Sequence, residues 1–358
     1  MSIYDINGTE LLHAFSVSGA SAEPLYDVQG NEVFGENPVT PLTWNMTDNY
    51  KGQVTDALDY IKTYKQSHQS AYALCQFNDV HTNFDGNEPN FIDYNRGYSI
   101  IDRMLFVGDM VNTCNATQYA NATAYMNGAS ESKKLVAMGN HEYGSYNSSV
   151  GNPETIYKAV INVSCTYKTN DVLIYYHDDS THNVRYIVLD YFYQTKTLAD
   201  SGHLLDMAQL EWLAGVLENS GSKDIIIVAH SMLSPFTGLE SNQTLSSTAT
   251  LTNYQNLIDL IVAYKNRSTY TVTVDGTSNS HSFASCTGDF VMYTTGHYHA
   301  LGYGDFGFNM FTCPTLGTTY GGSHKGFVFY LIDKSNQSIK VIQCSSELSN
   351  YISFDYTY

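Results

Sequence analysis

Residues 71–81 read AYALCQFNDVH, an apolar run that ends in Asp79 and His81. The segment Ala71–Phe77 has the length and the continuous apolar character of a buried strand, so we expect a strand there with the polar pair just beyond its carboxyl end. The two polar residues are two positions apart, and in an extended segment such side chains share one face. We therefore expect Asp79 and His81 to point in the same direction.

The same pattern recurs along the chain. Met104–Val107 runs into Gly108-Asp109, Leu135–Met138 into Gly139-Asn140-His141-Glu142, Arg185–Leu189 into Asp190, Asp224–Ala229 into His230, and Val291–Tyr293 into Gly296-His297-Tyr298-His299. Apolar residues at helical spacing in 50–64 and 204–217 add helices between strands, which predicts a layered α/β fold. In such folds the carboxyl ends of the strands line the edge where ligands bind. Nitrogen and oxygen side chains at several strand ends therefore indicate a constructed site.

Metal binding is one interpretation of these polar side chains. His297 and His299 would be neighbouring imidazoles on one extended face, which repel each other when protonated and favour a shared metal ion. Asp79-x-His81 alone is a weak motif, and a lone histidine such as His230 is more often a hydrogen-bonded residue at a strand end than a ligand. The joint order of the blocks is more specific than any single block.

The net charge of the chain disfavours one class of function. The chain has 17 Lys and Arg residues against 35 Asp and Glu residues, a formal net charge of −18. Such a surface repels phosphate backbones, so general nucleic-acid binding is not expected. If the protein handles phosphate, metal ions are the natural source of local positive charge.

Membrane and targeting signals are absent from the pattern. No apolar run approaches the ~20 residues of a membrane-spanning helix, and the first thirty residues show no secretory signal. We expect a soluble protein, and the sequence leaves a cytoplasmic, virion-associated or exported location open.

The ordered blocks Asp-x-His, Gly-Asp, Gly-Asn-His-Glu, His and Gly-His-x-His resemble the calcineurin-like metallophosphoesterase superfamily over about residues 71–300. The resemblance implies a four-layer αββα sandwich of two mixed β-sheets flanked by helices. It also implies a hydrolase of phosphate monoesters or diesters that acts on a small phosphorylated substrate. The implied cofactors are two divalent ions, drawn from Mn, Fe, Zn, Co or Mg.

The resemblance also implies a role for each matching residue. It assigns Asp79, His81 and His299 to one metal, Asn140, His230 and His297 to the other, and Asp109 to both. His141 would bind no metal but would lie over the leaving group and protonate it, so that His141 and Asp109 are the catalytic residues. Tyr143 and Tyr298 lie inside the site loops and are candidates for a substrate pocket. The oligomeric state is left open.

Two departures separate the chain from subfamilies of this superfamily. Purple acid phosphatases carry a tyrosine three residues after the bridging aspartate, where this chain has Asn112, so a tyrosinate–iron(III) pair is not expected. Serine/threonine protein phosphatases carry Asp-Arg-Gly beyond the second block, whereas this chain reads Gly108-Asp109-Met-Val-Asn112. Their substrate-clamping arginine is therefore missing.

The N-terminal residues contain a short repeat, in which Tyr4–Leu12 is echoed by Tyr26–Phe34. The dipeptide Asn7-Gly8 favours a β-hairpin, so we expect a hairpin appendage over residues 1–40 and a catalytic domain over residues 41–358. The appendage is either a peripheral sheet or an attachment or oligomerisation module. It also motivates a second hypothesis for the chain, a surface-binding or virion-associated adhesion protein on a metallophosphoesterase scaffold.

Three further features receive ordinary interpretations. The histidines outside the blocks are expected to be surface or hydrogen-bonded residues: His13, His68, His177, His182, His203, His281 and His324. Ser241–Leu251 and Tyr270–Ser285 are rich in polar residues and are expected to be long loops that shape specificity. Residues 302–307 match a dinucleotide fingerprint, but Phe308–Thr312 indicates a strand where that motif needs a helix, so we interpret 302–307 as a turn.

Overall fold

The structure is a computed structural model that describes part of the chain. The described residues are 2–4, 10–13, 48–81, 100–112, 118–119, 122, 125–126, 129, 133–143, 167–168, 174–192, 203–239, 243–245, 251–316 and 326–358. The chain forms two compact units, Met1–Leu42 and Thr43–Tyr358. In the first unit, β1 (Ser2–Tyr4) pairs antiparallel with β2 (Glu10–His13), as predicted for the first copy of the repeat. The second copy, Tyr26–Phe34, lies outside the described residues.

The larger unit contains a six-stranded mixed sheet with the strand order β19-β18-β17-β3-β4-β5. Its strands are β3 (Ala71–Phe77), β4 (Arg103–Val107), β5 (Lys134–Ala137), β17 (Gly326–Asp333), β18 (Ser338–Ser345) and β19 (Ile352–Thr357). β3, β4 and β5 are parallel neighbours, whereas β17, β18 and β19 pair antiparallel. Every residue of β3 is buried, which explains why this strand reads as a continuous apolar run.

A second mixed sheet has nine strands in the order β11-β10-β15-β16-β14-β9-β8-β7-β6. Its strands are β6 (Tyr167–Lys168), β7 (Tyr175–Asp179), β8 (Val184–Val188), β9 (Asp224–Val228), β10 (Phe236–Gly238), β11 (Gln243–Leu245), β14 (Phe290–Thr295), β15 (Gly302–Asp305) and β16 (Asn309–Thr312). The central strands β8, β9, β14 and β16 are parallel to their neighbours in this group. Their carboxyl ends therefore lie at one edge of the sheet.

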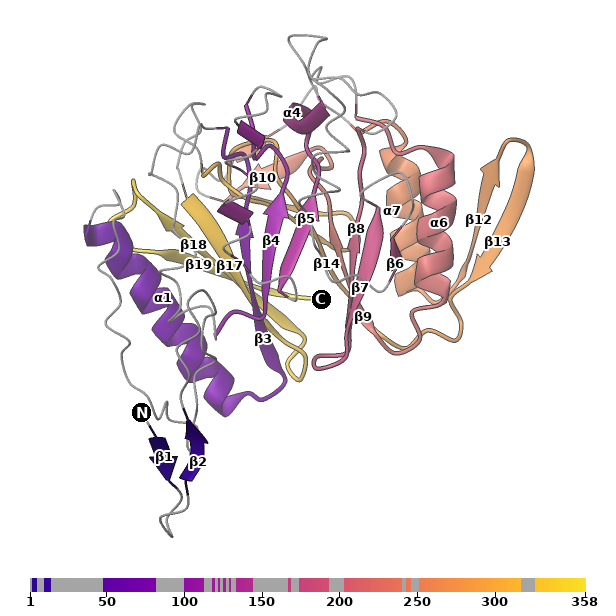
Figure 1. The fold of residues 1–358 in the computed structure, drawn as a ribbon. Coiled ribbons are helices and arrows are strands. Elements are labelled where there is room, and N and C mark those ends of the chain that lie inside the picture. Colours follow the sequence, from indigo (N-terminus) through magenta and orange to yellow (C-terminus); the bar gives the residue numbers. More distant parts are fainter. Residues whose placement is uncertain are drawn as a thin grey trace. The chain divides into compact units, whose positions relative to one another are not determined.

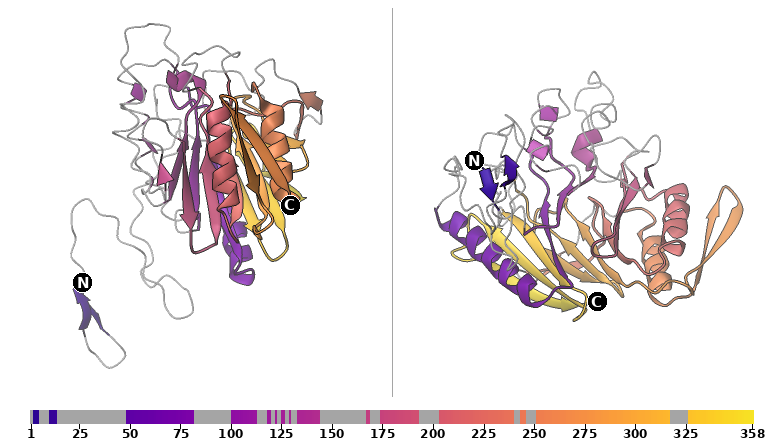
Figure 2. Two further views of the ribbon diagram at one scale, coloured as in Figure 1. Left: turned by 90° about the vertical axis from the view of Figure 1, so that its right-hand side faces the viewer. Right: turned by 60° about the horizontal axis from the view of Figure 1, so that its bottom comes forward.

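Helices cover the outer faces of the two sheets (Figures 1 and 2). α1 (Asp48–Ser67) packs on β3 and β18 of the six-stranded sheet, while α6 (Met207–Glu218) and α7 (Tyr254–Lys265) pack together on the side of the nine-stranded sheet. This confirms the predicted sandwich of two mixed sheets flanked by helices. None of the described helices is long and apolar enough to cross a membrane.

The predicted helix at 204–217 begins three residues later than expected. Asp206 accepts a hydrogen bond from the backbone N–H of Gln209 and so caps the helix, because a carboxylate satisfies a donor of the first turn that has no helical partner. Leu204, which precedes this cap, instead forms a parallel bridge with Thr252.

Three segments that were predicted to be loops or turns contain strands. Residues 270–285 form an antiparallel hairpin of β12 (Thr269–Val274) and β13 (Thr277–Ser282) that packs on α6 and α7. Most of its side chains are exposed, with Val272 and His281 buried, so the hairpin lacks the regular apolar alternation that identifies a strand. Within 302–307, Gly302–Asp305 is β15, and the turn is limited to the residues that follow, where Gly307 has a φ of +80°. In 241–251, the described residues 243–245 form β11, which pairs with β10.

Candidate metal centre

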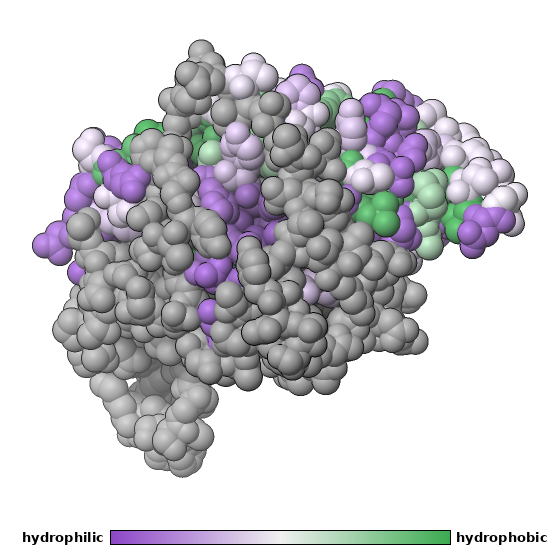
Figure 3. Space-filling model, turned by 90° about the horizontal axis from the view of Figure 1, so that it is seen from above, coloured by the Kyte–Doolittle hydropathy of each residue, from purple (hydrophilic) through white to green (hydrophobic). Residues whose placement is uncertain are grey.

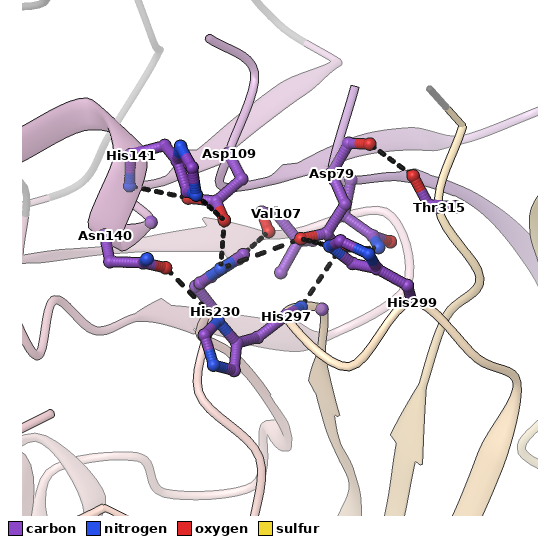
Figure 4. A network of polar contacts seen from close by, with 12 residues as sticks. Asp79, Val107, Asp109, Asn140, His141, His230, His297, His299 and Thr315 are labelled. Carbon is purple, nitrogen blue, oxygen red and sulfur yellow. Dashed lines mark hydrogen bonds and ion pairs between the residues drawn. The ribbon is translucent and has the colours of Figure 1, made fainter. Parts of the chain in front are cut away.

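The carboxyl ends of five strands from both sheets meet at one edge of the sandwich, and the polar residues predicted from the sequence follow them there (Figure 4). Asp79 and His81 follow β3, Asp109 follows β4, Asn140 and His141 begin the short helix α4 (Asn140–Tyr143) after β5, His230 follows β9, and His297 and His299 follow β14. Viewed from this side, hydrophilic surface lies at the centre of the molecule (Figure 3). The structure thus brings together all seven expected ligands and His141.

Asp79, His81 and His299 form one compact group. Oδ1 of Asp79 lies 3.2 Å from Nε2 of His299 and 3.6 Å from Nε2 of His81. The two Nε2 atoms are themselves 3.1 Å apart. Two imidazole nitrogens and a carboxylate oxygen thus face one small space, and such a set of three could hold a metal ion.

A second group is formed by Asp109, His230 and His297, whose ligand atoms also lie close enough together to hold an ion. Oδ2 of Asp109 is 3.1 Å from Nε2 of His230, and Nδ1 of His297 is 3.2 Å from Oδ1 of Asn140. The same Oδ2 of Asp109 lies 3.6 Å from Nε2 of His81. The Asp109 carboxylate therefore contacts a member of each group.

The backbone conformation of the site residues differs from the one expected from the sequence. Several site residues have positive φ angles: Asp79 (52°), His81 (45°), Asp109 (52°), His297 (72°) and His299 (61°). The expectation that Asp79 and His81 share a face of an extended segment was therefore wrong, although both do point into the site. Their N–H groups donate instead to the backbone oxygens of Gly108 at 3.1 Å and Asp109 at 3.2 Å, which holds the two loops together. Left-handed backbone at residues other than glycine is strained, and such strain is concentrated at functional sites.

Two glycines make the close approach of these loops possible. Gly108 has a φ of +77°, and a Cβ on it would lie 2.5 Å from Nδ1 of His230. A Cβ on Gly139 would lie 2.2 Å from Oδ1 of Asp109. The glycines of the Gly-Asp and Gly-Asn-His-Glu blocks are thus required by space at the site.

Glu142 holds the Asp109 loop in place through hydrogen bonds with its backbone. Its Oε2 accepts hydrogen bonds from the backbone N–H groups of Asp109 at 2.8 Å and Gly139 at 2.7 Å. Its Oε1 accepts from Met110 at 2.6 Å and Val111 at 3.3 Å. This buried carboxylate satisfies donors that no strand or helix would pair, so it fixes the position of Asp109.

Hydrogen bonds orient the other side chains. His297 donates its backbone N–H to Oδ2 of Asp79 at 2.9 Å, and Nδ2 of Asn78 donates to the same oxygen. His230 has Nδ1 at 2.7 Å from the carbonyl oxygen of Val107, so Nδ1 carries the proton and Nε2 faces Asp109. Such partners select the tautomer and the ring orientation that a metal ligand needs.

The carboxylates and the imidazoles of the site shift one another's pKa values. Although burial favours the neutral acid, His299 and His230 hold the pKa of Asp79 well below its ordinary value. The pKa of Asp109 is also lowered, again against the effect of burial, chiefly by His230. Burial favours neutral His230, but Asp109 and Asp79 raise the pKa of His230 to about 10. The site without metal is therefore a cluster of carboxylates and protonated imidazole.

The donor set fits a metal ion. Oδ1 of Asp79 and Nε2 of His230 are buried; each belongs to an ion pair, but neither forms a well-aligned hydrogen bond with the described residues. Buried polar atoms without hydrogen bonds are costly, and here a carboxylate oxygen and an imidazole nitrogen are the atoms that transition metals prefer. A cation at each group would satisfy them.

The two predicted pocket tyrosines lie differently. Tyr143 is buried, and its hydroxyl donates to Oδ2 of Asp190 at 2.5 Å, so this end of the side chain faces the interior. Tyr298 is half-buried and packs edge-on against Phe236, with the ring centroids 5.0 Å apart. Tyr298 therefore remains the better candidate for contact with a substrate.

Among the other histidines, His203 lies next to the site, which no sequence signal indicated. Its ring centroid is 4.5 Å from that of His297. Burial, together with the imidazoles of His297 and His230, lowers the pKa of His203 to about 2, so its ring is neutral. His68, His177 and His182 are hydrogen-bonded away from the site, as predicted, and the side chains of His13 and His324 lie outside the described residues.

His281, on β13, has an acidic neighbour at each ring nitrogen. Nε2 lies 3.1 Å from Glu211 and Nδ1 lies 3.0 Å from Glu218. The carboxylates lie on opposite sides of the ring, so the three residues do not converge on one point as metal ligands would. They join the hairpin to α6.

Comparison with known proteins identifies the fold. A profile of the calcineurin-like phosphoesterase family matches residues 73–263. No match to a curated protein was found. Among solved structures, a dimetal phosphatase from Danio rerio aligns with 80% of this chain and 99% of its own, at 12% identity and a TM-score of 0.52. Vacuolar Protein Sorting 29 from Cryptosporidium parvum aligns with 80% and 99%, at 9% identity and a TM-score of 0.36. Because the family profile spans more than half of the 358 residues and the five motif blocks meet at one site, the chain belongs to the calcineurin-like phosphoesterase family.

Proposed function

We propose that the protein hydrolyses phosphate esters of small molecules with two divalent metal ions. The observation that carries the proposal is the position of Asp109, whose Oδ2 lies 3.1 Å from Nε2 of His230 and 3.6 Å from Nε2 of His81. A carboxylate between two imidazole-rich groups is the usual way to hold two ions ~3.5–4 Å apart. Membership of a phosphoesterase family and the fold shared with a dimetal phosphatase support the same reaction class.

The seven side chains would divide between the two ions. One ion would be held by Asp79, His81 and His299, the other by Asn140, His230 and His297, and both by Asp109. When bound, such ions lower the pKa of water to generate a nucleophile near neutral pH and offset the charge of a phosphoryl group. The mixture of imidazole and oxygen ligands suits Mn, Fe, Zn or Co, and suits Mg less well because Mg prefers oxygen alone.

The contacts of His141 support a role as the general acid. Its Nδ1 lies 2.8 Å from the carbonyl oxygen of Asn112, so Nδ1 carries a proton and donates a hydrogen bond to that oxygen. Nε2 is then the atom on the side of the site, 4.0 Å from Oδ2 of Asp109. Because the side chain is 14% exposed, Nε2 can pass a proton to a leaving oxygen and regain one from solvent.

All seven ligand positions are occupied by suitable residues, which favours an active enzyme over the adhesion hypothesis. A scaffold that has lost catalysis and kept only a binding role no longer needs its ligands. Nothing in the described residues favours attachment as the sole function. An attachment role for residues 1–40 beside catalysis stays a prediction.

The test is metal analysis and hydrolysis of 4-nitrophenyl phosphate and bis(4-nitrophenyl) phosphate. After reconstitution with Mn²⁺, the unaltered protein should hold two ions and cleave at least one ester. Asp109→Asn should lose metal and activity, whereas His141→Ala should keep both ions and lose about 10²–10⁴-fold in rate. Asp275→Asn is the matched control, because Asp275 also has a positive φ, of 48°, but lies at the exposed tip of the β12–β13 hairpin.

Two results would count against the proposal. One is an unaltered protein that holds fewer than two ions and cleaves neither ester. The other is Asp109→Asn with the metal content and rate of Asp275→Asn.

A further inference from the structure

His203 is a buried histidine next to His297 of the proposed metal centre. Its side chain has no exposed surface. Its backbone oxygen accepts the N–H of Thr252 at 2.8 Å, and the N–H of the next residue, Leu204, donates to Tyr191 at 3.0 Å. The chain is therefore pinned on both sides of this position, and the ring has little freedom to move.

The ring of His203 contacts two rings edge-on. The centroid of Phe192 is 4.7 Å away, and that of His297 is 4.5 Å away at an angle of 71° between the planes. His297 is the residue whose Nδ1 lies 3.2 Å from Oδ1 of Asn140. Rotation of the His297 ring would turn Nδ1 away from Asn140, and the packed ring of His203 opposes that rotation.

Ser231 connects His203 to the other imidazole of the same ligand group. Nδ1 of His203 lies 2.6 Å from Oγ of Ser231, which directly follows His230 in the chain. The backbone oxygen of Ser231 accepts the hydroxyl of Tyr293 at 2.5 Å. The residue after His230 is therefore fixed by its side chain and by its backbone.

Packing alone does not explain an imidazole at position 203. Nε2 of His203 is buried and forms no hydrogen bond with the described residues. A buried polar atom without a partner is destabilising, and a phenyl ring would fill a similar volume without that cost. The side chain is therefore better explained by its bond to Ser231 and by its contact with His297 than by stability.

We propose that His203 and Ser231 are positioning residues that hold His230 and His297 in the geometry required by the second metal ion. The inference rests on the proposed function, because those two imidazoles are the ligands assigned to that ion. Because His203 is fully buried, the role that we assign to it is to orient ligands and not to contact substrate. The contacts of His203 and Ser231 described above lead to the second group, so the first group, Asp79, His81 and His299, should not depend on them.

The experiment measures Mn²⁺ affinity at each group separately by calorimetric titration of metal-free protein. His299→Ala leaves the second group intact, and His230→Ala leaves the first. Ser231→Ala and His203→Phe are then added to each background. In the His299→Ala background both should weaken Mn²⁺ binding by about 10–100-fold, the usual effect of removing a residue that orients a metal ligand. In the His230→Ala background neither should change the affinity.

Ser220→Ala is the matched control. Ser220 is also fully buried and bonds one side chain, the hydroxyl of Tyr264 at 3.1 Å, but it precedes the amino end of β9, opposite the site. It should leave Mn²⁺ affinity unchanged in both backgrounds. Far-UV circular dichroism checks folding, and Ser231→Ala, the smaller change, decides the question if His203→Phe does not fold.

Each outcome separates this inference from the proposed function. Unchanged affinity, equal weakening in both backgrounds, or a lower melting temperature without loss of affinity would overturn the positioning role while the metal centre stands. If the unaltered protein binds no Mn²⁺, the proposed function fails and the inference fails with it.

Discussion

Gly139→Ala tests whether the space around Asp109 is as restricted as the structure indicates. A Cβ on Gly139 would lie 2.2 Å from Oδ1 and 2.5 Å from the backbone N of Asp109, whereas ordinary contact begins at 3.4 Å. The nearer obstacle is a side chain, but the second is backbone and cannot rotate away. Asp109 must therefore be displaced by about 1 Å, and a shift of that size at a reacting centre costs on the order of 10²-fold in rate.

The stability cost of the same change should be moderate. Inserting a methyl group into a packed region costs about 1–3 kcal/mol, so the protein should still fold. Gly52→Ala is the matched control, since a Cβ on Gly52, in α1, would have nothing within 4 Å. There the same substitution should stabilise the protein by about 0.5–1 kcal/mol, because alanine loses less backbone entropy in a helix.

Three assays decide the outcome. Urea denaturation should give free energies of unfolding that change in opposite directions for the two variants. Mn²⁺ titration and ester hydrolysis should be impaired only in Gly139→Ala. If Gly139→Ala binds two ions and turns over at the rate of the unaltered protein, then Asp109 does not occupy the position on which the proposed centre depends.

Three further predictions concern protons and hydrogen bonds. Asp109 raises the pKa of His230 to about 10, so metal binding at neutral pH must release a proton from His230. Calorimetry in buffers of different ionisation enthalpy should detect this release, and the metal affinity should fall as the pH falls. A binding heat that does not depend on the buffer would contradict this prediction. In the metal-free protein, the stability contributed by His230 should be full below pH ~6.5, the unfolded value, and be lost as the pH rises through about 10. Glu142→Gln replaces one acceptor oxygen by a donor and so leaves backbone N–H groups of the Asp109 loop unpaired. Urea denaturation should show that the free energy of unfolding falls by about 1–3 kcal/mol. Part of the cost is offset, because burial and Asp109 disfavour the charged form of Glu142 and raise its pKa. Equal stability of the two proteins would refute this anchoring role.

The elements that carry the site were predictable because their sequence signals are local. β3 matches its predicted bounds, Ala71–Phe77, residue for residue, since a strand buried on both faces reads as one apolar run. The ligands follow such runs directly, so topology alone brings them to one edge. The local geometry was less predictable. The left-handed backbone of Asp79 and His81 depends on hydrogen bonds to the Gly108-Asp109 loop, which is distant in sequence.

His203 and the β12–β13 hairpin show what local patterns miss. The contacts that distinguish His203 come from Phe192, Ser231 and His297, which no spacing rule connects to it. The hairpin is held by its turn and by Thr–Ser pairs such as Thr271–Ser280, with hydroxyl oxygens 2.8 Å apart, and its exposed polar faces carry little alternation of hydropathy.

Each of the two ligand groups takes members from both β-sheets. Asp79 and His81 extend from the six-stranded sheet and His299 from the nine-stranded one, while Asp109 comes from the former and His230 from the latter. Metal coordination would therefore link the two halves of the sandwich, which are the six-stranded and the nine-stranded sheet. Prying the halves apart at this edge would have to rupture coordinate bonds in both groups, so chelation should lower the force at which the molecule yields.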